Sequence, residues 1–419
     1  MADIDKSLPN QPEVTVEDQK TIEVDTGTPV EPQKDIEVTE TLDGGAEISF
    51  DPNAIIPQSS NTHFQNLAEL LDGTILDPLG ANLMNDYIDY KASRKDWENT
   101  YRNGLDLLGF KYTQRTEPFK GAAGVTHPVL AEAVTQFQAQ AYKELLPADG
   151  PVRTQILGLQ TPQKQDQSNR VKDFMNYQIM DQMKEYEPEF DQMLFYLPLS
   201  GSTFKKVYYD DLLGRAVSKF IPADDLVVPY SATSLDDAEA VMHIIKMSKN
   251  DLRKQQVGGF YRDVDLTPPN MQNDEITKKE QELEGVKQLK QDDMYTLIEC
   301  HVNVDLEGFE DMKDGETTGI KLPYVVTVEE GSRKVLSIRR NYKEGDIRKN
   351  KINYFVQFKF LPGTGFYGFG LIHMIGGLSR TATTALRQLL DAGTLSNLPA
   401  GFKSRGIRVR DDAQPLQPG

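Results

Sequence analysis

The sequence predicts an α+β fold with a helical N-terminal half, a mostly antiparallel sheet region and a long C-terminal helix. Two observations lead to this prediction. Apolar residues recur at helical spacing between residues 61 and 201, and from Ser202 the spacing changes to two, the period of a strand. The strands expected after Ser202 are separated by turns and short insertions instead of crossover helices, which favours antiparallel pairing.

Length and composition limit the kinds of protein that this chain can be. Its 419 residues suffice for about two or three domains. Residues 1–60 hold 14 Asp and Glu against 3 Lys and Arg, and such a segment buries too little apolar surface to order itself. We therefore expect a disordered acidic tail there. The single cysteine, Cys300, excludes an internal disulfide framework and is expected to be a buried structural thiol. No leader and no long apolar run occurs, so we expect no membrane partner.

Helices are expected throughout residues 61–201. Asp77-Pro78 resembles a helix start, and an apolar stripe follows that Gly109 should end, formed by Trp97, Tyr101, Leu105 and Leu108. A helix over residues 129–146 has one apolar and one glutamine-rich face and should stop at Pro147. Thr161-Pro162 opens a further helical region, which we expect Pro188 to break before the chain turns helical again up to Gly201.

Strands are expected between residues 202 and 361. A hairpin is predicted first, then a strand that Ser248 links to a short helix, and later four more strands. The expected strands are residues 204–209, 216–221, 241–247, 295–304, 324–328, 335–340 and 352–361. The polar stretch 267–293 indicates an exposed helix or insertion.

No pattern in the sequence indicates catalysis. There is no P-loop, zinc motif or serine-nucleophile motif, and none of the five histidines has ligand spacing to another. Acidic pairs at residues 210–211 and 224–225 are more typical of turn capping than of a metal site. Cys300 and His301 should point to opposite sides of a strand, and His127 is expected to pack within a loop. We therefore predict no catalytic, cofactor-binding or metal-binding residues, and no enzyme.

The segment after the last expected strand contains G-x-G-x-x-G, which leaves two interpretations. One is a nucleotide-binding oxidoreductase that uses residues 363–368, although that motif needs a parallel βαβ unit. The other is a hinge at the root of a helix over residues 371–392, formed by Gly363, Gly365, Gly368 and Gly370. Gly393 and a basic segment follow this helix. Residues 371–410 hold six Lys and Arg against one acid, a composition that suits phosphates or an acidic protein surface.

Several strings resemble portal proteins of tailed bacteriophages, and the resemblance is strongest to the large portals of short-tailed phages. The strings are 117–128 (EPFKGAAGVTHP), 139–151 (AQAYKELLPADGP), 368–371 (GFGL), 376–378 (GGL), 385–393 (ALRQLLDAG) and 399–401 (PAG). The resemblance implies a ring of about twelve subunits at a capsid vertex, assembled in the host cytoplasm and carried in the virion. It also implies a terminase, a tail adaptor, major capsid or scaffold proteins and non-specifically passing double-stranded DNA as partners, and no cofactor.

The resemblance further implies an order of parts. Residues 61–201 would be the helical part of a wing, 202–361 its α+β sheet region, 362–395 the hinge and stem helix, and 396–419 the start of a clip. Arg380 and Arg387 would face the channel and DNA, and the clip residues Lys403, Arg405 and Arg408 would contact terminase, tail proteins or DNA. No counterpart of the second stem helix, channel loop and crown precedes Gly419, so we expect that C-terminal part to be missing. A capsid or tail adaptor without a channel role is the alternative.

Overall fold

The computed structural model describes residues 62–210, 213–269, 274–286, 294–313, 316–363 and 365–397, and the backbone of residues 36–40 and 46–50. The chain divides into two compact units, residues 1–62 and 63–419. In the first unit, β1 (Ile36–Glu40) pairs antiparallel with β2 (Ala46–Phe50), inside the segment expected to lack order. The rest of that segment, and the predicted clip residues Lys403, Arg405 and Arg408, lie outside the described residues.

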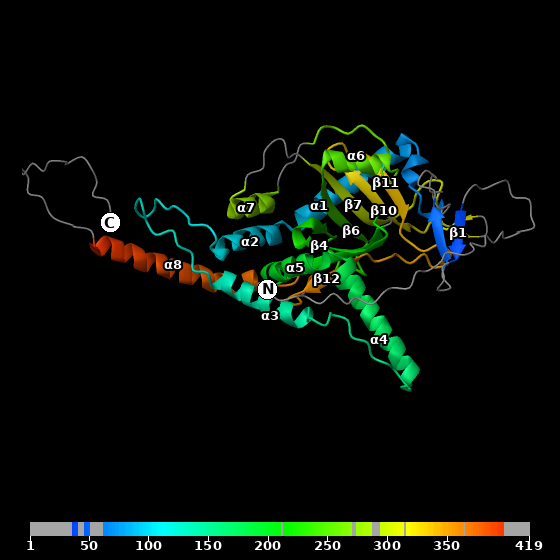
Figure 1. Cartoon of the computed structure of the whole chain (residues 1–419). Coiled ribbons are helices and arrows are strands. Elements are labelled where there is room, and N and C mark those ends of the chain that lie inside the picture. Colours follow the sequence, from blue (N-terminus) through cyan, green and yellow to red (C-terminus); the bar gives the residue numbers. More distant parts are fainter. Residues whose placement is uncertain are drawn as a thin grey trace, which may run out of the picture. The chain divides into compact units, whose positions relative to one another are not determined.

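The second unit combines helices with a five-stranded, a three-stranded and a small two-stranded sheet, all antiparallel (Figure 1). Its helices are η1 (Thr62–Phe64), η2 (Leu67–Glu69), α1 (Gly73–Ser93), α2 (Lys95–Leu105), η3 (Asp106–Leu108), α3 (Val129–Leu145), α4 (Pro162–Tyr177), η4 (Gln178–Gln182), α5 (Tyr186–Ser200), η5 (Ala223–Asp225), α6 (Lys249–Val257), α7 (Glu275–Glu284) and α8 (Leu371–Asn397). Its strands are β3 (Ser202–Asp210), β4 (Arg215–Pro222), β5 (Leu226–Val227), β6 (Ala240–Met247), β7 (Tyr295–Val304), β8 (Met312–Lys313), β9 (Glu316–Thr317), β10 (Leu322–Glu329), β11 (Val335–Arg340) and β12 (Phe355–Lys359). The predicted α+β class is confirmed.

The start of α1 differs from the prediction. The helix begins at Gly73, with Asp72 at the N-cap, and Pro78 lies inside it instead of at its first position. A proline there removes one helical hydrogen bond. The helix nevertheless continues, because one apolar face of it is buried against the sheet. This face is formed by Leu76, Leu83, Met84 and Tyr87. The predicted end of the following apolar stripe is confirmed, since Gly109 has a left-handed φ of 74°.

The break between α4 and α5 was also predicted at the wrong residue. Thr161 caps α4 as expected, because its side chain accepts a hydrogen bond from the Lys164 backbone N–H. The chain then leaves helical geometry at Met183, and Pro188 lies in the first turn of α5. Backbone N–H groups in a first turn have no helical partner, so proline is tolerated there.

The strands form the expected antiparallel pairs. The five-stranded sheet has the order β11-β10-β7-β6-β5, the three-stranded sheet has the order β12-β3-β4, and β8 pairs with β9. Strands β3 and β4 form the predicted hairpin. The last strand, β12, is shorter than the predicted 352–361. One face of the five-stranded sheet, which includes Ile298 and fully buried Cys300, packs on α1. The expectation of a buried thiol is confirmed.

The opposite face of the five-stranded sheet meets α6 and the three-stranded sheet. Lys206 of β3 forms an ion pair with Glu299 of β7 at 2.6 Å, and His301 contacts the same carboxylate at 2.7 Å. Burial alone would raise the pKa of Glu299, but Lys206 and His301 hold it well below its usual value. The two sheets are thus joined by buried charge as well as by apolar contacts.

Candidate functional site

Helix α8 runs from Leu371 to Asn397 and is the longest helix in the described part of the chain. Gly393 was expected to end it, but this residue lies inside the helix. A glycine within a helix costs only about 1 kcal/mol relative to alanine, which the flanking turns offset. Figure 1 shows α8 leading away from the sheets of the second unit.

One face of α8 packs on helices of the same subunit. Ile372, Gly376, Ser379 and Thr383 are buried along it, and Ile372 joins an apolar cluster with residues of α2, η3, α3 and α5. The small side chains on this face therefore allow close packing within one subunit.

The C-terminal half of α8 is held by the connection between η3 and α3, residues 109–128, which we call the 109–128 loop. Arg387 donates from Nε to the Val125 carbonyl at 2.7 Å, and Asp391 accepts from the Ala123 N–H at 2.6 Å. Nearer the middle of the helix, the Thr383 hydroxyl accepts from the His127 N–H at 3.0 Å. His127 thus packs in a loop against α8, as expected.

These contacts join two regions that are far apart in sequence. The 109–128 loop contains the string 117–128, and α8 contains the strings 376–378 and 385–393. Both carried the resemblance described above, and Arg387 and Val125 are 262 residues apart. The loop and α8 therefore form one structural site.

The glycine segment before α8 crosses closely over the junction of α5 and β3. A Cβ atom at Gly370 would lie 2.4 Å from the Leu199 carbonyl oxygen, and one at Gly368 would lie 2.7 Å from that of Gly201. The Gly368 N–H donates to the Ser202 hydroxyl at 2.8 Å. Close backbone approach accounts for these two glycines. Gly365 has no such neighbour, so the hinge role stays a prediction.

Arg94, at the junction of α1 and α2, anchors the same segment. Its guanidinium donates to the Tyr367 hydroxyl at 2.9 Å, to the carbonyls of Ala223 and Leu226, and to the Glu98 carboxylate. Burial opposes its charge, but Tyr367 and Glu98 raise the pKa of Arg94 overall. Trp97 stacks on the Tyr367 ring at 4.8 Å between centroids. Neither Arg94 nor Asp391 was singled out by the sequence.

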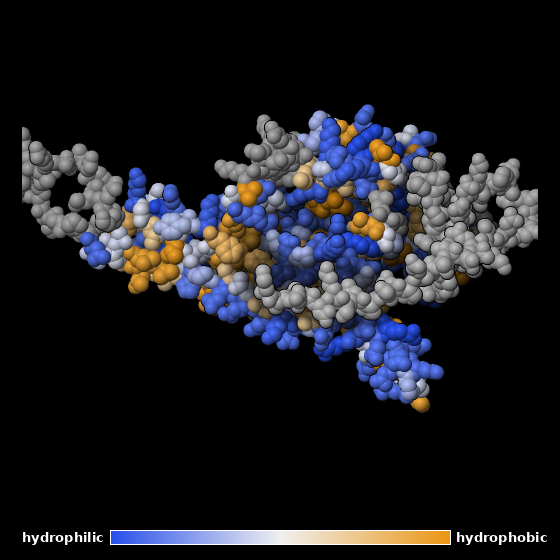
Figure 2. All heavy atoms as spheres, viewed as in Figure 1, coloured by the Kyte–Doolittle hydropathy of each residue, from blue (hydrophilic) through white to orange (hydrophobic). Residues whose placement is uncertain are grey.

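The face of α8 opposite the packed one is apolar and exposed. Leu378 is 70% exposed and Leu389 is 72% exposed, and Met374 is exposed on the same face. Figure 2 shows apolar residues gathered over the part of the surface that α8 occupies. A long helix with a second, exposed apolar face is a candidate interaction surface.

The two predicted channel arginines differ in their surroundings. Both line a polar cleft of about 840 Å³ between the 109–128 loop, α7 and α8. Arg387 is engaged by the loop, whereas Arg380 is exposed and forms no ion pair with any carboxylate that the structure describes. Two lysines of the same cleft, Lys111 and Lys279, pair with Glu282. Arg380 is thus the cation of this cleft that is available to a partner.

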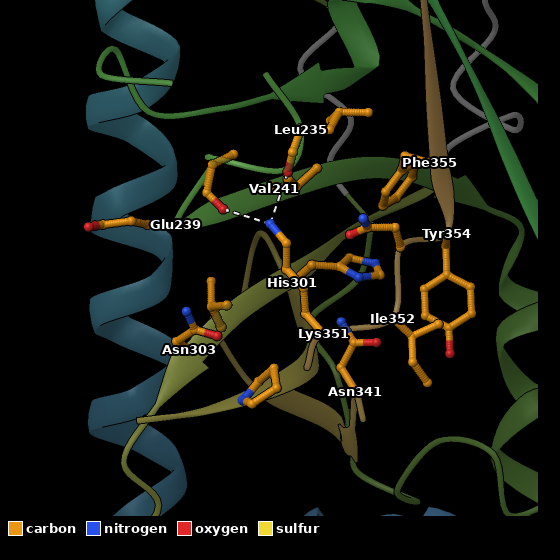
Figure 3. Close-up of a pocket in the computed structure, with 14 residues that line it drawn as sticks. Leu235, Glu239, Val241, His301, Asn303, Asn341, Lys351, Ile352, Tyr354 and Phe355 are labelled. Carbon is orange, nitrogen blue, oxygen red and sulfur yellow. Dashed lines mark hydrogen bonds between the residues drawn. The ribbon is translucent and has the colours of Figure 1, made fainter. Parts of the chain in front are cut away.

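Metal coordination and membrane spanning are not supported by the described residues. No three His, Cys, Asp or Glu side chains come together there to hold a metal, and Asp210 instead accepts from the Leu213 N–H in a turn. The pocket between the two sheets, where Lys351 donates to backbone carbonyls, has a volume of only about 30 Å³ (Figure 3). No helix in the described ranges combines the length and apolar content needed to cross a membrane.

The oxidoreductase interpretation lacks its structural context. Residues 361–370 follow β12, which pairs antiparallel with β3, and every strand pair among the described residues is antiparallel. A G-x-G-x-x-G loop binds a dinucleotide within a parallel βαβ unit. The glycine segment is instead packed against the backbone of α5 and β3.

Comparison with known proteins agrees with the resemblance. No curated protein matches the sequence. The family model described as phage SU10 portal protein matches residues 205–413, about half of the chain. This match includes the five-stranded sheet, the three-stranded sheet from within β3 onward, the glycine segment and α8, but not the strings at 117–128 and 139–151. The chain therefore belongs to the phage SU10 portal protein family.

Proposed function

We propose that the chain is a structural subunit of a ring of about twelve copies at the capsid vertex of the virion. The ring would form the channel through which double-stranded DNA is packaged and ejected, and it would dock terminase, tail adaptor and capsid or scaffold proteins. The single observation that carries the proposal is the exposed apolar face of α8, which supports contact between neighbouring copies. Family membership supports the location and the partners.

Charge supports the channel role. The 109–128 loop holds three Lys and Arg against one Glu, and α8 holds two Arg against one Asp, in a chain with a net charge of −18. Exposed Arg380 lies on this locally positive surface. Scattered cations without a base-reading element suit DNA that passes without regard to sequence.

The proposal is tested by the assembly of the purified full chain. We expect ring particles in negative-stain images and a matching mass by light scattering. The double substitution Leu378→Asp and Leu389→Asp should convert rings to monomers, because it places charge in the apolar contact. Ile347→Asp, at a residue 97% exposed and away from α8, is the matched control and should leave rings intact.

The outcomes separate the alternatives. A wild-type chain that stays monomeric at high concentration contradicts the proposal. Rings in which α8 lies on the outer rim, away from the central opening, would favour a capsid or tail adaptor without a channel role.

A further inference from the structure

A projecting segment, residues 151–177, has no role in the site described above, and we call it the arm. It consists of an extended strand-like stretch and α4, and no side chain of α4 is buried. Polar contacts hold its two parts together: the Val152 N–H donates to Asn176 Oδ1 at 2.9 Å, and the Ser168 hydroxyl donates to that of Thr154 at 2.8 Å. Figure 1 shows α4 pointing away from the sheets of the second unit.

The arm lacks the apolar burial that normally stabilises a helix. A helix of 16 residues is marginal in water unless it packs on something. The arm's own two parts enclose a polar cleft of about 550 Å³, and its large apolar side chains face solvent. Leu157 is 87% and Leu159 is 79% exposed at its tip, and Phe174 is exposed on α4. Figure 2 shows an apolar group at the tip of this otherwise polar projection.

The arm is also positively charged in an acidic protein. It has four cations, Arg153, Lys164, Arg170 and Lys172, against two aspartates. None of the four forms an ion pair with a carboxylate in the described part of the chain. The arm therefore presents cations and exposed apolar groups together, which suits an acidic protein surface.

The same chain carries a complementary surface, which we call the acidic patch: Asp86 and Asp89 of α1 and Glu239 next to β6. All three side chains are exposed, and none pairs with a cation that the structure describes. The three lie around Tyr90, whose pKa is raised by burial and by their charges. Burial and neighbouring Asp89 likewise raise the pKa of Asp86, which indicates repulsion within the patch.

We propose that the arm of one copy docks on the acidic patch of the next copy around the ring. The inference rests on the proposed ring and adds a second contact to that of α8. Because the arm and the patch are different surfaces, the contact is head to tail, the kind that closes a ring when repeated. Docking would cover the exposed face of α4 and neutralise the repelling carboxylates.

Charge reversal tests the contact. Arg170→Glu with Lys172→Glu should raise the protein concentration needed for half-assembly at least tenfold, and Asp86→Lys with Asp89→Lys should do the same. Combining both pairs should restore assembly toward that of the wild type, since the attraction is re-formed with opposite signs. Lys343→Glu with Arg348→Glu, two exposed cations outside the arm, is the matched control and should change assembly little.

The outcomes keep the two proposals apart. If the wild type forms rings and arm reversal leaves their assembly unchanged, the docking inference is overturned, the ring proposal stands, and the arm faces a different protein. Loss of assembly without rescue by the combined reversal also overturns the pairing of arm and patch. Thermal unfolding of each variant confirms that its fold is intact, which is expected because the altered side chains lie outside the core.

Discussion

Lys205 is a lysine in an unusual place, with only 4% of its surface exposed. Its Nζ lies 4.1 Å from the centre of the Tyr186 ring and 4.9 Å from that of Phe190. No hydrogen-bond partner for this nitrogen occurs among the described residues. Burial lowers the pKa of Lys205 to about 8, and the carboxylates of Glu189 and Glu185 only partly oppose this. The charged form is thus held at a cost in stability.

Replacing this lysine should stabilise the protein. We expect Lys205→Met to raise the free energy of unfolding at pH 7 by about 1–3 kcal/mol, since a buried charge gives way to an apolar chain of similar length. In the wild type, the pKa of Lys205 is about 8 in the folded state and near 10.5 in the unfolded state. Between pH 8 and pH 10.5 the folded state therefore binds fewer protons than the unfolded state. Wild-type stability should therefore rise from pH 8 to pH 10.5, and that of the variant should not.

Denaturant unfolding at pH 7 and pH 10 measures both effects. Lys219→Met on the neighbouring strand β4, at an exposed lysine, is the control and should alter stability by no more than about 0.5 kcal/mol. Equal pH dependence in Lys205→Met and the wild type would show that another group titrates in this range.

Single residues differ in how well their roles could be predicted. Cys300 was predictable because alternation along a strand fixes which side chains share a face. Arg94 and Asp391 were not, because each bonds to backbone groups more than a hundred residues away in sequence. Such long-range hydrogen bonds leave no periodic pattern in the sequence. A single charged residue in a helix that makes them cannot be distinguished in the sequence from one that faces solvent.

At the scale of elements, the 109–128 loop and α8 depend on each other. Asp391→Ala should leave the Ala123 N–H without its acceptor, remove the carboxylate that faces Arg115, and cost about 1–3 kcal/mol. The same substitution should speed hydrogen exchange of the loop amides near Ala123, as measured by mass spectrometry. Arg380→Ala, on the same helix but without a described partner, is the matched control and should leave exchange unchanged.

The glycines around α8 provide a second test. Gly370→Ala should destabilise the protein by about 2 kcal/mol, because the added methyl group would lie 2.4 Å from the Leu199 carbonyl oxygen. Gly377→Ala, inside α8 with no atom within 4 Å of the added group, should stabilise it by about 0.5–1 kcal/mol. Melting temperatures of the two variants should therefore move in opposite directions. Similar shifts would contradict the close crossing.

Helix ends were the least predictable elements. Pro78, Pro188 and Gly393 were each expected to start, break or end a helix, and each lies inside one. Local preference amounts to about 1–3 kcal/mol at such positions, which burial of a whole helical face exceeds. Thr161 and Gly201 were predicted correctly because a side-chain cap and a left-handed residue act locally.

At the scale of the whole molecule, the fold class followed from the change of hydrophobic period at Ser202. This prediction does not depend on the exact residues at which individual helices and strands begin or end. The contact between the 109–128 loop and α8 could not be predicted, because a single sequence does not show which distant segments lie close together in the fold. Family membership settles the broader question of class: a portal protein is a structural component, so the chain is a structural protein and not an enzyme.

The contact between the 109–128 loop and α8 can form only late in the synthesis of the chain. Arg387 leaves the ribosome 262 residues after Val125, a delay of about 13–52 s at about 5–20 residues per second. Until then the loop has no helix to bind, and the apolar face proposed to join neighbouring copies does not exist. The contact proposed for α8 between neighbouring copies can therefore form only after nearly the whole chain has been synthesised.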